Sequence, residues 1–536
     1  MQFTMFLLRL AVFCGLLASG LGCEAAESAS SASETGILTP PGAAFPRING
    51  ARIFGLRPGS PLLYRMPVTG QRPIHYEAEG LPDGLRINQE SGFITGILHQ
   101  TGTYRIRLIA TNALGSAHLD WRLICGDRLA LTPPMGWNSY NCWGNNISQE
   151  KVLSSANAMV SSGLIEHGWS YVNIDDGWQG ERGGRLNALQ PNAKFPDLPG
   201  MVATLHALGL KFGIYSTPWR GTYAGFAGSG CDRADGQYDW ILEGMTNADY
   251  RIGRTEEEWT KLRPQNWCFG KNSFVDADAQ QWVNWGVDFL KYDWYPYDVP
   301  SIDAVLGAIR SKPRDIVLSL SNNGHFEQAG DWAARANQWR TTQDIWDSWD
   351  SLNDRGFNED RWAGYSGPGH WIDPDMLVVG RLGFGTALRP SNLTRDEQYT
   401  QISLWALLSA PLILGCDLAA LDPFTLSLLS NDEVIELDQD PLGRQATQCF
   451  NDGPRVVYGK MLEDGSMALG LFNRGTTRTN VVAHWYHLPM PITGEYRVRD
   501  VWRQKDLGTY VGSYNNSINY EVAPHGVVLL RLIPKP

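Results

Sequence analysis

The chain has 536 residues, a formal net charge of -11 and a mean hydropathy of -0.26. This length predicts two or three domains, and the acidic balance argues against a nucleic-acid-binding surface, which needs clustered Lys and Arg. The 21 Trp and 20 Tyr residues combine flat apolar faces with a polar edge. Most of them are expected to pack a large core, and the others suit stacking against a ring-shaped ligand.

The first 25 residues resemble a secretory signal peptide, with a short apolar run followed by small residues, "LLASGLGC". The same ending allows an alternative, a lipoprotein modified at Cys23. Residues 26–40, rich in Ser and Ala, read as a linker that cannot bury a core. No later segment has the apolar length of a membrane helix. The protein is therefore predicted to be exported to the periplasm, the cell surface or the medium.

Residues 41–128 alternate polar and apolar residues, and turn pairs such as Asp83-Gly84 and Ser91-Gly92 recur along them. The pattern predicts a small β-sandwich. It resembles the immunoglobulin-like modules that precede some bacterial glycosidases, which implies a spacer or, alternatively, a carbohydrate-binding role.

Residues 129–440 alternate short β-type runs with helical patterns such as "SQEKVLSSANAMVSSGL", which is typical of parallel strands joined by helices. The eight candidate strands are "PMGWNSY", "YVNIDDGW", "KFGIYST", "DFLKYDW", "IVLSLSNN", "QWRTTQD", "HWIDPDML" and "LILGCDL". Eight such units predict a (β/α)8 TIM barrel. An open doubly wound sheet is the alternative, but no GxGxxG loop follows any strand. Residues 441–536 return to strict alternation and predict a carboxy-terminal β-sandwich.

Ionisable and aromatic residues stand at the ends of most barrel strands. These residues are Asp175, Asp176, Tyr215, Lys291, Asp293, Arg340, Asp344, Asp373 and Asp375. Since the carboxyl ends of barrel strands converge on one face, the pattern predicts a catalytic pocket there. One acidic strand end alone could be a helix cap.

The residue types narrow the chemistry of this pocket. Carboxylates without Cys/His clusters argue against zinc, no phosphate cradle supports magnesium, and no G-x-S-x-G elbow indicates a serine hydrolase. Paired carboxylates among aromatics and a few cations are typical of glycoside cleavage, in which one carboxylate attacks the anomeric carbon and a protonated one supplies the leaving oxygen with a proton. The alternative from another class is a carbohydrate-binding protein with a degenerate barrel.

Six motifs resemble glycoside hydrolase family 27, the melibiase-type α-galactosidases and α-N-acetylgalactosaminidases, in order and spacing over roughly residues 131–445. The motifs are "LTPPMGWNSYN", "YVNIDDGWQ", "KFGIYS", "FLKYDW", "QWRTTQDIWDSW" and "GPGHWIDPDMLVVG". The resemblance implies a retaining exo-glycosidase, similar to α-galactosidases, that needs no cofactor and no metal. It leaves the oligomeric state open.

Position by position, the resemblance implies that Asp293 is the nucleophile and Asp344 the acid/base, with Asp347 as a local rival for the second role. Lys291 and Arg340 are implied to bind sugar hydroxyls, and Lys291 is also expected to keep Asp293 ionised. The other implied substrate-binding residues are Asp175 and Asp176 (4- and 6-hydroxyls), Tyr140, Tyr215, Ser321 and Asp375.

Three departures from the family pattern qualify this prediction. Tyr223 and Tyr295 stand where many members have a disulfide, so packing is expected to hold those loops. The connection over residues 227–280 is long, and Cys231 with Cys268 could close it. Ser321 stands where galactosidases carry a glutamate at the sugar 2-position. This small residue leaves room for the acetamido group of an α-N-acetylgalactosaminide, unless Asn322, Asn323 or His325 fills the space. A β-L-arabinopyranoside is a further alternative substrate, because it differs from an α-galactoside by lacking the 6-hydroxymethyl group, but the Asp175-Asp176 pair argues against it.

Overall fold

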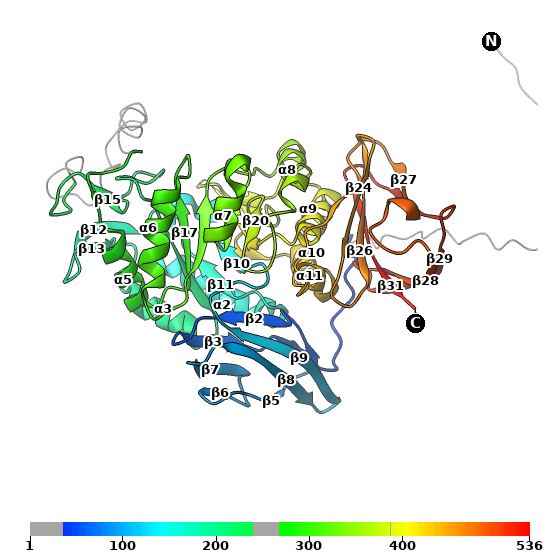
Figure 1. Ribbon diagram of the computed structural model, residues 1–536, viewed down its shortest axis with the longest axis horizontal. Helices are drawn as coiled ribbons and strands as arrows, with labels where there is room; N and C mark the ends of the chain where they lie inside the picture. Colours follow the sequence, from blue (N-terminus) through cyan, green and yellow to red (C-terminus); the bar gives the residue numbers. More distant parts are fainter. Residues whose placement is uncertain (1–35, 239–266, 386, 536) are drawn as a thin grey trace, which may run out of the picture.

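The computed structural model describes residues 36–238, 267–385 and 387–535. A (β/α)8 barrel forms the middle of the molecule, with an immunoglobulin-like sandwich below it and a carboxy-terminal β-sandwich at its side (Figure 1). The predicted fold class is confirmed. The leader, Cys23 and most of the linker lie outside the described residues. Within those ranges, no helix has the length and apolar character needed to cross a bilayer.

Eight parallel strands form the barrel sheet, in the order β20-β19-β18-β17-β14-β11-β10-β23. They are β10 (Met135–Asn138), β11 (Tyr171–Asn173), β14 (Lys211–Ser216), β17 (Phe289–Asp293), β18 (Val317–Ser321), β19 (Gln338–Arg340), β20 (Trp371–Asp373) and β23 (Leu412–Leu414). A bridge between Leu377, just after β20, and Leu414 closes the ring. Each of the eight predicted strands is therefore confirmed.

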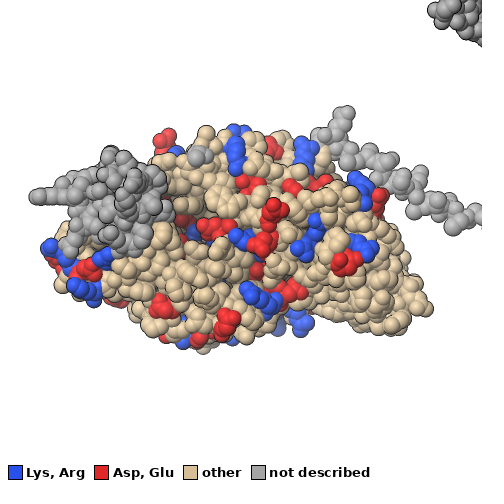
Figure 2. Space-filling model, turned by 90° about the horizontal axis from the view of Figure 1, so that it is seen from above, with Lys and Arg blue, Asp and Glu red and all other residues tan. Residues whose placement is uncertain are grey.

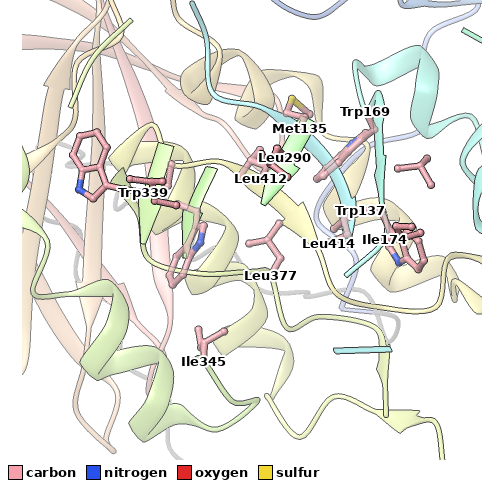
Figure 3. Packing of buried hydrophobic residues seen from close by; sticks show 14 of the residues in the cluster. Met135, Trp137, Trp169, Ile174, Leu290, Trp339, Ile345, Leu377, Leu412 and Leu414 are labelled. Carbon is pink, nitrogen blue, oxygen red and sulfur yellow. The ribbon is translucent and has the colours of Figure 1, made fainter. Parts of the chain in front are cut away.

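Close packing inside the barrel explains two glycines in these strands. A Cβ on Gly136 of β10 would lie 2.4 Å from the carbonyl oxygen of Tyr171, and one on Gly213 of β14 would lie 1.9 Å from Asn173 Oδ1. Neither position has room for any larger residue. The surrounding core is apolar, and Figure 3 shows Met135 beside Leu290 and Leu412 within it.

Helices surround the barrel, and several of them begin at polar caps. They are α2 (Gln149–Ser161), α3 (Leu198–Ala207), α5 (Val275–Trp285), α6 (Val299–Arg310), α7 (Ala329–Arg335), α8 (Trp349–Gly356) and α9 (Arg395–Leu408). Ser148 caps α2, Asp298 caps α6 and Ser348 caps α8, each accepting a backbone N–H of the first turn. Thr394 and Glu397 form a full capping box on α9. These local signals fix where each strand-to-helix connection ends.

The immunoglobulin-like module consists of a four-stranded and a three-stranded sheet. The strands are β2 (Ile53–Leu56), β9 (Gly115–Cys125), β8 (Gly102–Asn112) and β5 (His75–Glu79) in the first sheet, with β3 (Pro61–Arg65), β7 (Phe93–Ile97) and β6 (Leu85–Ile87) in the second. The module contacts the amino ends of the barrel strands, below the barrel in Figure 1. Arg57 pairs with Asp315 at 2.7 Å, and Arg65 pairs with Glu166 at 2.6 Å. The module is thus fixed to the barrel by charged hydrogen bonds.

The carboxy-terminal sandwich pairs a six-stranded sheet with a two-stranded one. Its strands are β24 (Thr447–Asn451), β25 (Arg455–Met461), β26 (Met467–Asn473), β31 (Val527–Pro534), β28 (Gly494–Asp500) and β29 (Lys505–Gly512), and then β27 (Thr479–His484) with β30 (Ser517–Val522). Helix α9 packs against β26 and β31, and Trp502 Nε1 donates to Ser403 Oγ of α9 at 2.8 Å. The domain therefore stabilises the barrel from the side.

Candidate active site

The polar strand ends meet in a pocket at the carboxyl face of the barrel. Asn138, Lys291, Ser321, Arg340 and Asp375 line it, from five different strands or the segments that follow them. Seen from above the molecule, acidic and basic side chains lie together across the middle of this face (Figure 2). The barrel thus brings residues more than 200 positions apart into one charged cavity.

Asp293 ends strand β17 and is buried in the pocket. Its Oδ2 accepts a hydrogen bond from the Tyr215 hydroxyl at 3.0 Å, whereas its buried Oδ1 has no hydrogen-bond partner. Burial raises the pKa of Asp293 to about 6, against the lowering effect of Lys291 and Tyr215. Lys291 acts in the expected direction, but burial outweighs it. The result is a buried carboxylate with one oxygen that has no hydrogen-bond partner, as a nucleophile requires.

The tandem acids Asp175 and Asp176, just beyond β11, take different partners. Asp175 Oδ2 accepts from Lys291 Nζ at 2.7 Å and from Asn138 Nδ2 at 2.8 Å. Asp176 Oδ2 accepts the backbone N–H of Ala224 at 2.7 Å, while its buried Oδ1 has no hydrogen-bond partner. Burial raises the pKa of Asp176 to about 7. One acid is thus held by a cation, and the other retains an acceptor for a ligand hydroxyl.

Arg340 connects the other predicted acids. Its Nη1 lies 3.0 Å from Asp375 Oδ1, and its Nη2 donates to Asp344 Oδ1 at 3.3 Å. Arg340 is buried, but 68% of the Asp344 side chain is exposed. Asp344 therefore stands at the solvent-exposed mouth of the pocket.

The carboxylate of Asp375 accepts several hydrogen bonds from within the protein. Beyond Arg340, its carboxylate accepts the backbone N–H groups of Ile345 and Met376, both at 2.8 Å. Its φ of +92° is a conformation that L residues rarely adopt. Because Ile345 directly follows Asp344, the carboxylate of Asp375 fixes both the arginine and the segment that carries Asp344.

The rival acid, Asp347, has a different environment. Its side chain is only 4% exposed, and it accepts two hydrogen bonds from Arg389, at 2.5 and 3.0 Å, and one from the backbone N–H of Asn392 at 2.7 Å. These bonds tie the loop after β19 to the loop around residue 390. The carboxylate of Asp347 thus holds two loops together, whereas the carboxylate of Asp344 is exposed to solvent.

Tyr223 and Tyr295 pack against aromatic and imidazole rings. They stand at the two positions where the family pattern has a disulfide. Tyr223 contacts Trp219 and Trp267 with ring centroids 5.4 and 4.9 Å apart, and Tyr295 lies 5.6 Å from His325. Packing thus holds this side of the pocket, as expected. In the long connection, the Cys231 thiol donates to the carbonyl of Gln237 at 3.1 Å, so it forms no disulfide with Cys268. Residues 239–266 of that connection lie outside the described residues.

Ser321 ends β18 opposite Asp293 and is buried in the pocket wall. The Tyr223 hydroxyl lies close to the side chain of Asn322, the next residue, and near both Asp293 and Asp344. The side chains of Tyr223 and Asn322 therefore lie near the small Ser321 side chain in this part of the pocket.

The predicted site residues Tyr140, Asp175, Asp176, Tyr215, Lys291, Asp293, Ser321, Arg340, Asp344 and Asp375 all lie in or around this one pocket. The sequence analysis did not assign site roles to Asn138 and Tyr223. Asn138 ends β10, so the rule that strand ends face the pocket could have found it. The proximity of Tyr223 to Asn322 joins two loops that are about 100 residues apart in the sequence, and it had no sequence signal. In the described ranges, no three His, Cys, Asp or Glu side chains are arranged to hold a metal ion.

A barrel that holds one buried and one exposed carboxylate close to Lys291 and Arg340, at the carboxyl ends of its strands, is typical of glycoside hydrolases. Comparison with known proteins identifies the family. The family model described as Alpha galactosidase A matches residues 132–246 and 266–440, and the Alpha galactosidase C-terminal beta sandwich domain matches residues 452–532. An Ig domain model matches residues 50–120. The chain therefore belongs to the α-galactosidase family of glycoside hydrolases, family 27.

Individual relatives agree with this assignment. The probable alpha-galactosidase of Dictyostelium discoideum is 32% identical over 80% of this chain and 98% of its own, and alpha-galactosidase 2 of Arabidopsis thaliana is 32% identical over 77% and 92%. Among solved structures, a Bacteroides fragilis protein matches with a TM-score of 0.78 and 30% identity over 92% of this chain and 99% of its own. A family 27 β-L-arabinopyranosidase from Geobacillus stearothermophilus matches with a TM-score of 0.61 and 28% identity over 76% and 97%.

Proposed function

We propose that this protein is an exported retaining exo-glycosidase that removes terminal α-linked galactose from oligosaccharides or polysaccharide side chains. The observation that carries the proposal is the contrast between Asp293, buried with one oxygen that has no hydrogen-bond partner, and Asp344, exposed and paired with the buried Arg340. Such a pair can attack a bound sugar from inside while protonating the departing group from outside.

In the first step, an oxygen of ionised Asp293 attacks the anomeric carbon and the glycosidic bond breaks. The departing oxygen takes the proton of Asp344, which leaves a glycosyl ester on Asp293 and a carboxylate on Asp344. In the second step, Asp344 removes a proton from water, the water oxygen attacks the same carbon, and Asp293 is released as a carboxylate. Two inversions retain the anomeric configuration.

The remaining residues bind and orient the sugar. Asp176, through its unpartnered oxygen, and the Lys291-paired Asp175 are placed to receive the 4- and 6-hydroxyls, which favours galactose over a pentopyranose that lacks the 6-hydroxymethyl. Arg340 and Lys291 donate to other hydroxyls. The rings of Tyr140 and Tyr215 provide apolar faces in the pocket wall, and the Tyr215 hydroxyl donates to Asp293.

A panel of 4-nitrophenyl glycosides tests the proposal. We expect release from the α-galactoside, with the α-anomer of galactose as the first product by NMR. Exclusive release from the α-N-acetylgalactosaminide would instead support the alternative that Ser321 leaves room for an acetamido group, and exclusive release from the β-L-arabinopyranoside would support a pentopyranosidase. Failure to cleave any of the three would favour a carbohydrate-binding protein.

Export is the second part of the proposal and rests on the leader-like first 25 residues. Expression of the full chain in a bacterial host, followed by mass spectrometry of the mature protein, tests it. A new amino terminus near residue 25 supports secretion, a lipid-modified Cys23 supports the lipoprotein alternative, and an intact amino terminus contradicts both.

A further inference from the structure

An exposed aromatic side chain lies next to Asp344 on the rim of the pocket. Along residues 344–347, burial alternates strictly, so that Asp344 and Trp346 are exposed and Ile345 and Asp347 are buried. Asp344 and Trp346 are therefore the two side chains of this segment that reach the solvent. Trp346 is 55% exposed, so much of its ring surface is available to a ligand.

Hydrogen bonds and a second ring hold Trp346 in place. Its backbone N–H donates to Ser351 Oγ at 2.9 Å, so the chain at this position is fixed to helix α8. Its indole lies against Phe384, with ring centroids 4.8 Å apart and a 39° tilt. The neighbouring phenyl ring supports the indole and leaves much of it open to solvent. The two rings form a preorganised apolar surface.

Phe384 also connects the two rings to the part of the sugar pocket that contains Tyr140. The backbone N–H of Phe384 donates to the carbonyl of Asn141 at 2.8 Å, next to Tyr140, which is itself partly exposed. Burial, together with the nearby carboxylates of Asp176, Asp175 and Asp344, raises the pKa of Tyr140 to about 12, and the Tyr140 hydroxyl lies near these carboxylates. Tyr140, Phe384 and Trp346 thus follow the rim from the pocket wall to the acid at its mouth.

We propose that Trp346, supported by Phe384, is the binding surface for the leaving group, and that this group is a second sugar ring. The inference rests on the proposed function, because it assumes that Asp344 protonates the departing oxygen. The group bonded to that oxygen must then lie just outside Asp344, over the indole. The C–H face of a pyranose is apolar and rigid and packs on an aromatic ring, whereas a methyl aglycone is too small to cover it.

The experiment compares kcat/KM for two substrates with the same galactose, methyl α-galactopyranoside and galactose α-1,6-linked to glucose. For Trp346→Ala we expect a loss of roughly 3–10-fold on the disaccharide, the order of one aromatic contact, and a change below about twofold on the methyl glycoside. Trp346→Phe restores most of the disaccharide rate. Tyr514→Ala is the matched control, since Tyr514 is a 66% exposed aromatic of the distant carboxy-terminal domain, and it leaves both constants unchanged.

The outcomes separate this inference from the function beneath it. Equal losses on both substrates, or no loss on either, with a wild-type thermal melt, overturn the leaving-group role of Trp346 while the galactosidase activity stands. A wild-type enzyme that cleaves neither substrate overturns the proposed function and this inference together.

Discussion

Buried aspartates lie at both ends of the barrel, but their pKa values are shifted in opposite directions. At the amino end, Asp288 accepts from His206 at 2.8 Å and from Arg314 at 2.6 Å; although burial opposes it, these partners lower the pKa of Asp288 below its ordinary value. At the carboxyl end, burial outweighs the partners and raises the pKa of Asp293 to about 6 and of Asp176 to about 7. Fully paired charges stabilise the amino end of the barrel, whereas incompletely paired charges at the carboxyl end remain available to a substrate.

The largest expected effect comes from Asp293→Asn at the carboxyl end. Loss of the nucleophile lowers kcat by roughly 10^4-fold or more, measured on the aryl α-galactoside. The folded Asp293 keeps its proton up to a pKa of about 6, above the unfolded value of 3.8, so its ionisation costs stability as pH rises through this window. The variant is therefore about 1–3 kcal/mol more stable than wild type at pH 7 and equal to it near pH 3. A kcat within tenfold of wild type would show that another residue attacks.

The next comparison separates the two acids after β19. Asp344→Asn lowers kcat by about 10^2- to 10^4-fold on substrates with poor leaving groups, because the general acid is lost. Asp347→Asn keeps kcat within about tenfold but lowers the free energy of unfolding by about 1–3 kcal/mol, since it weakens the bonds to Arg389 and Asn392. Rate measurements and urea unfolding of both variants check this. The reverse pattern would assign the acid role to Asp347.

At the amino end, Arg57→Ala is expected to affect stability alone. Arg57 pairs with Asp315 and donates to the carbonyls of Arg310, Lys312 and Arg314, the last two residues lying in the turn after α6. Its loss lowers the free energy of unfolding by about 2–4 kcal/mol and leaves kcat/KM within about twofold. The control is Arg497→Ala, which breaks an exposed pair with Asp506 and costs less than about 1 kcal/mol. A large fall in kcat/KM for Arg57→Ala would mean that the two ends are coupled.

The smallest effect concerns the pH profile. Wild-type kcat/KM is expected to fall as pH drops below about 6, where Asp293 takes up a proton. The Tyr215 hydroxyl lowers the pKa of Asp293, so Tyr215→Phe moves this acidic limb to higher pH by roughly half a unit, besides reducing the rate. An unmoved or downward-shifted limb would show that another group controls it.

Much of this site could be predicted because the chemistry lies at strand ends. "YVNIDDGW" and "FLKYDW" combine a buried strand with charged residues at its carboxyl end, so Asp176 and Asp293 could be located before the fold was seen. The spacing from Arg340 favours Asp344 over Asp347, but it does not reveal that Asp347 is paired with Arg389, 42 residues further along the chain. The balance between burial and Lys291 at Asp293 also depends on the packed cavity, which no local pattern encodes.

The mode of docking of the immunoglobulin-like module constrains how the catalytic unit could be separated from it. Strand β2 runs so close to the barrel that a Cβ on Gly55 would lie 3.0 Å from the Leu131 side chain, and Lys211 Nζ lies 4.5 Å from the Phe54 ring centroid. Leu129 and Leu131 are both buried. A barrel expressed from residue 129 onward would thus lose the cover over its underside and expose apolar residues together with unmatched charges. Such a truncated enzyme is expected to aggregate, so the two units are better treated as one indivisible folding entity than as a catalyst with a detachable appendage.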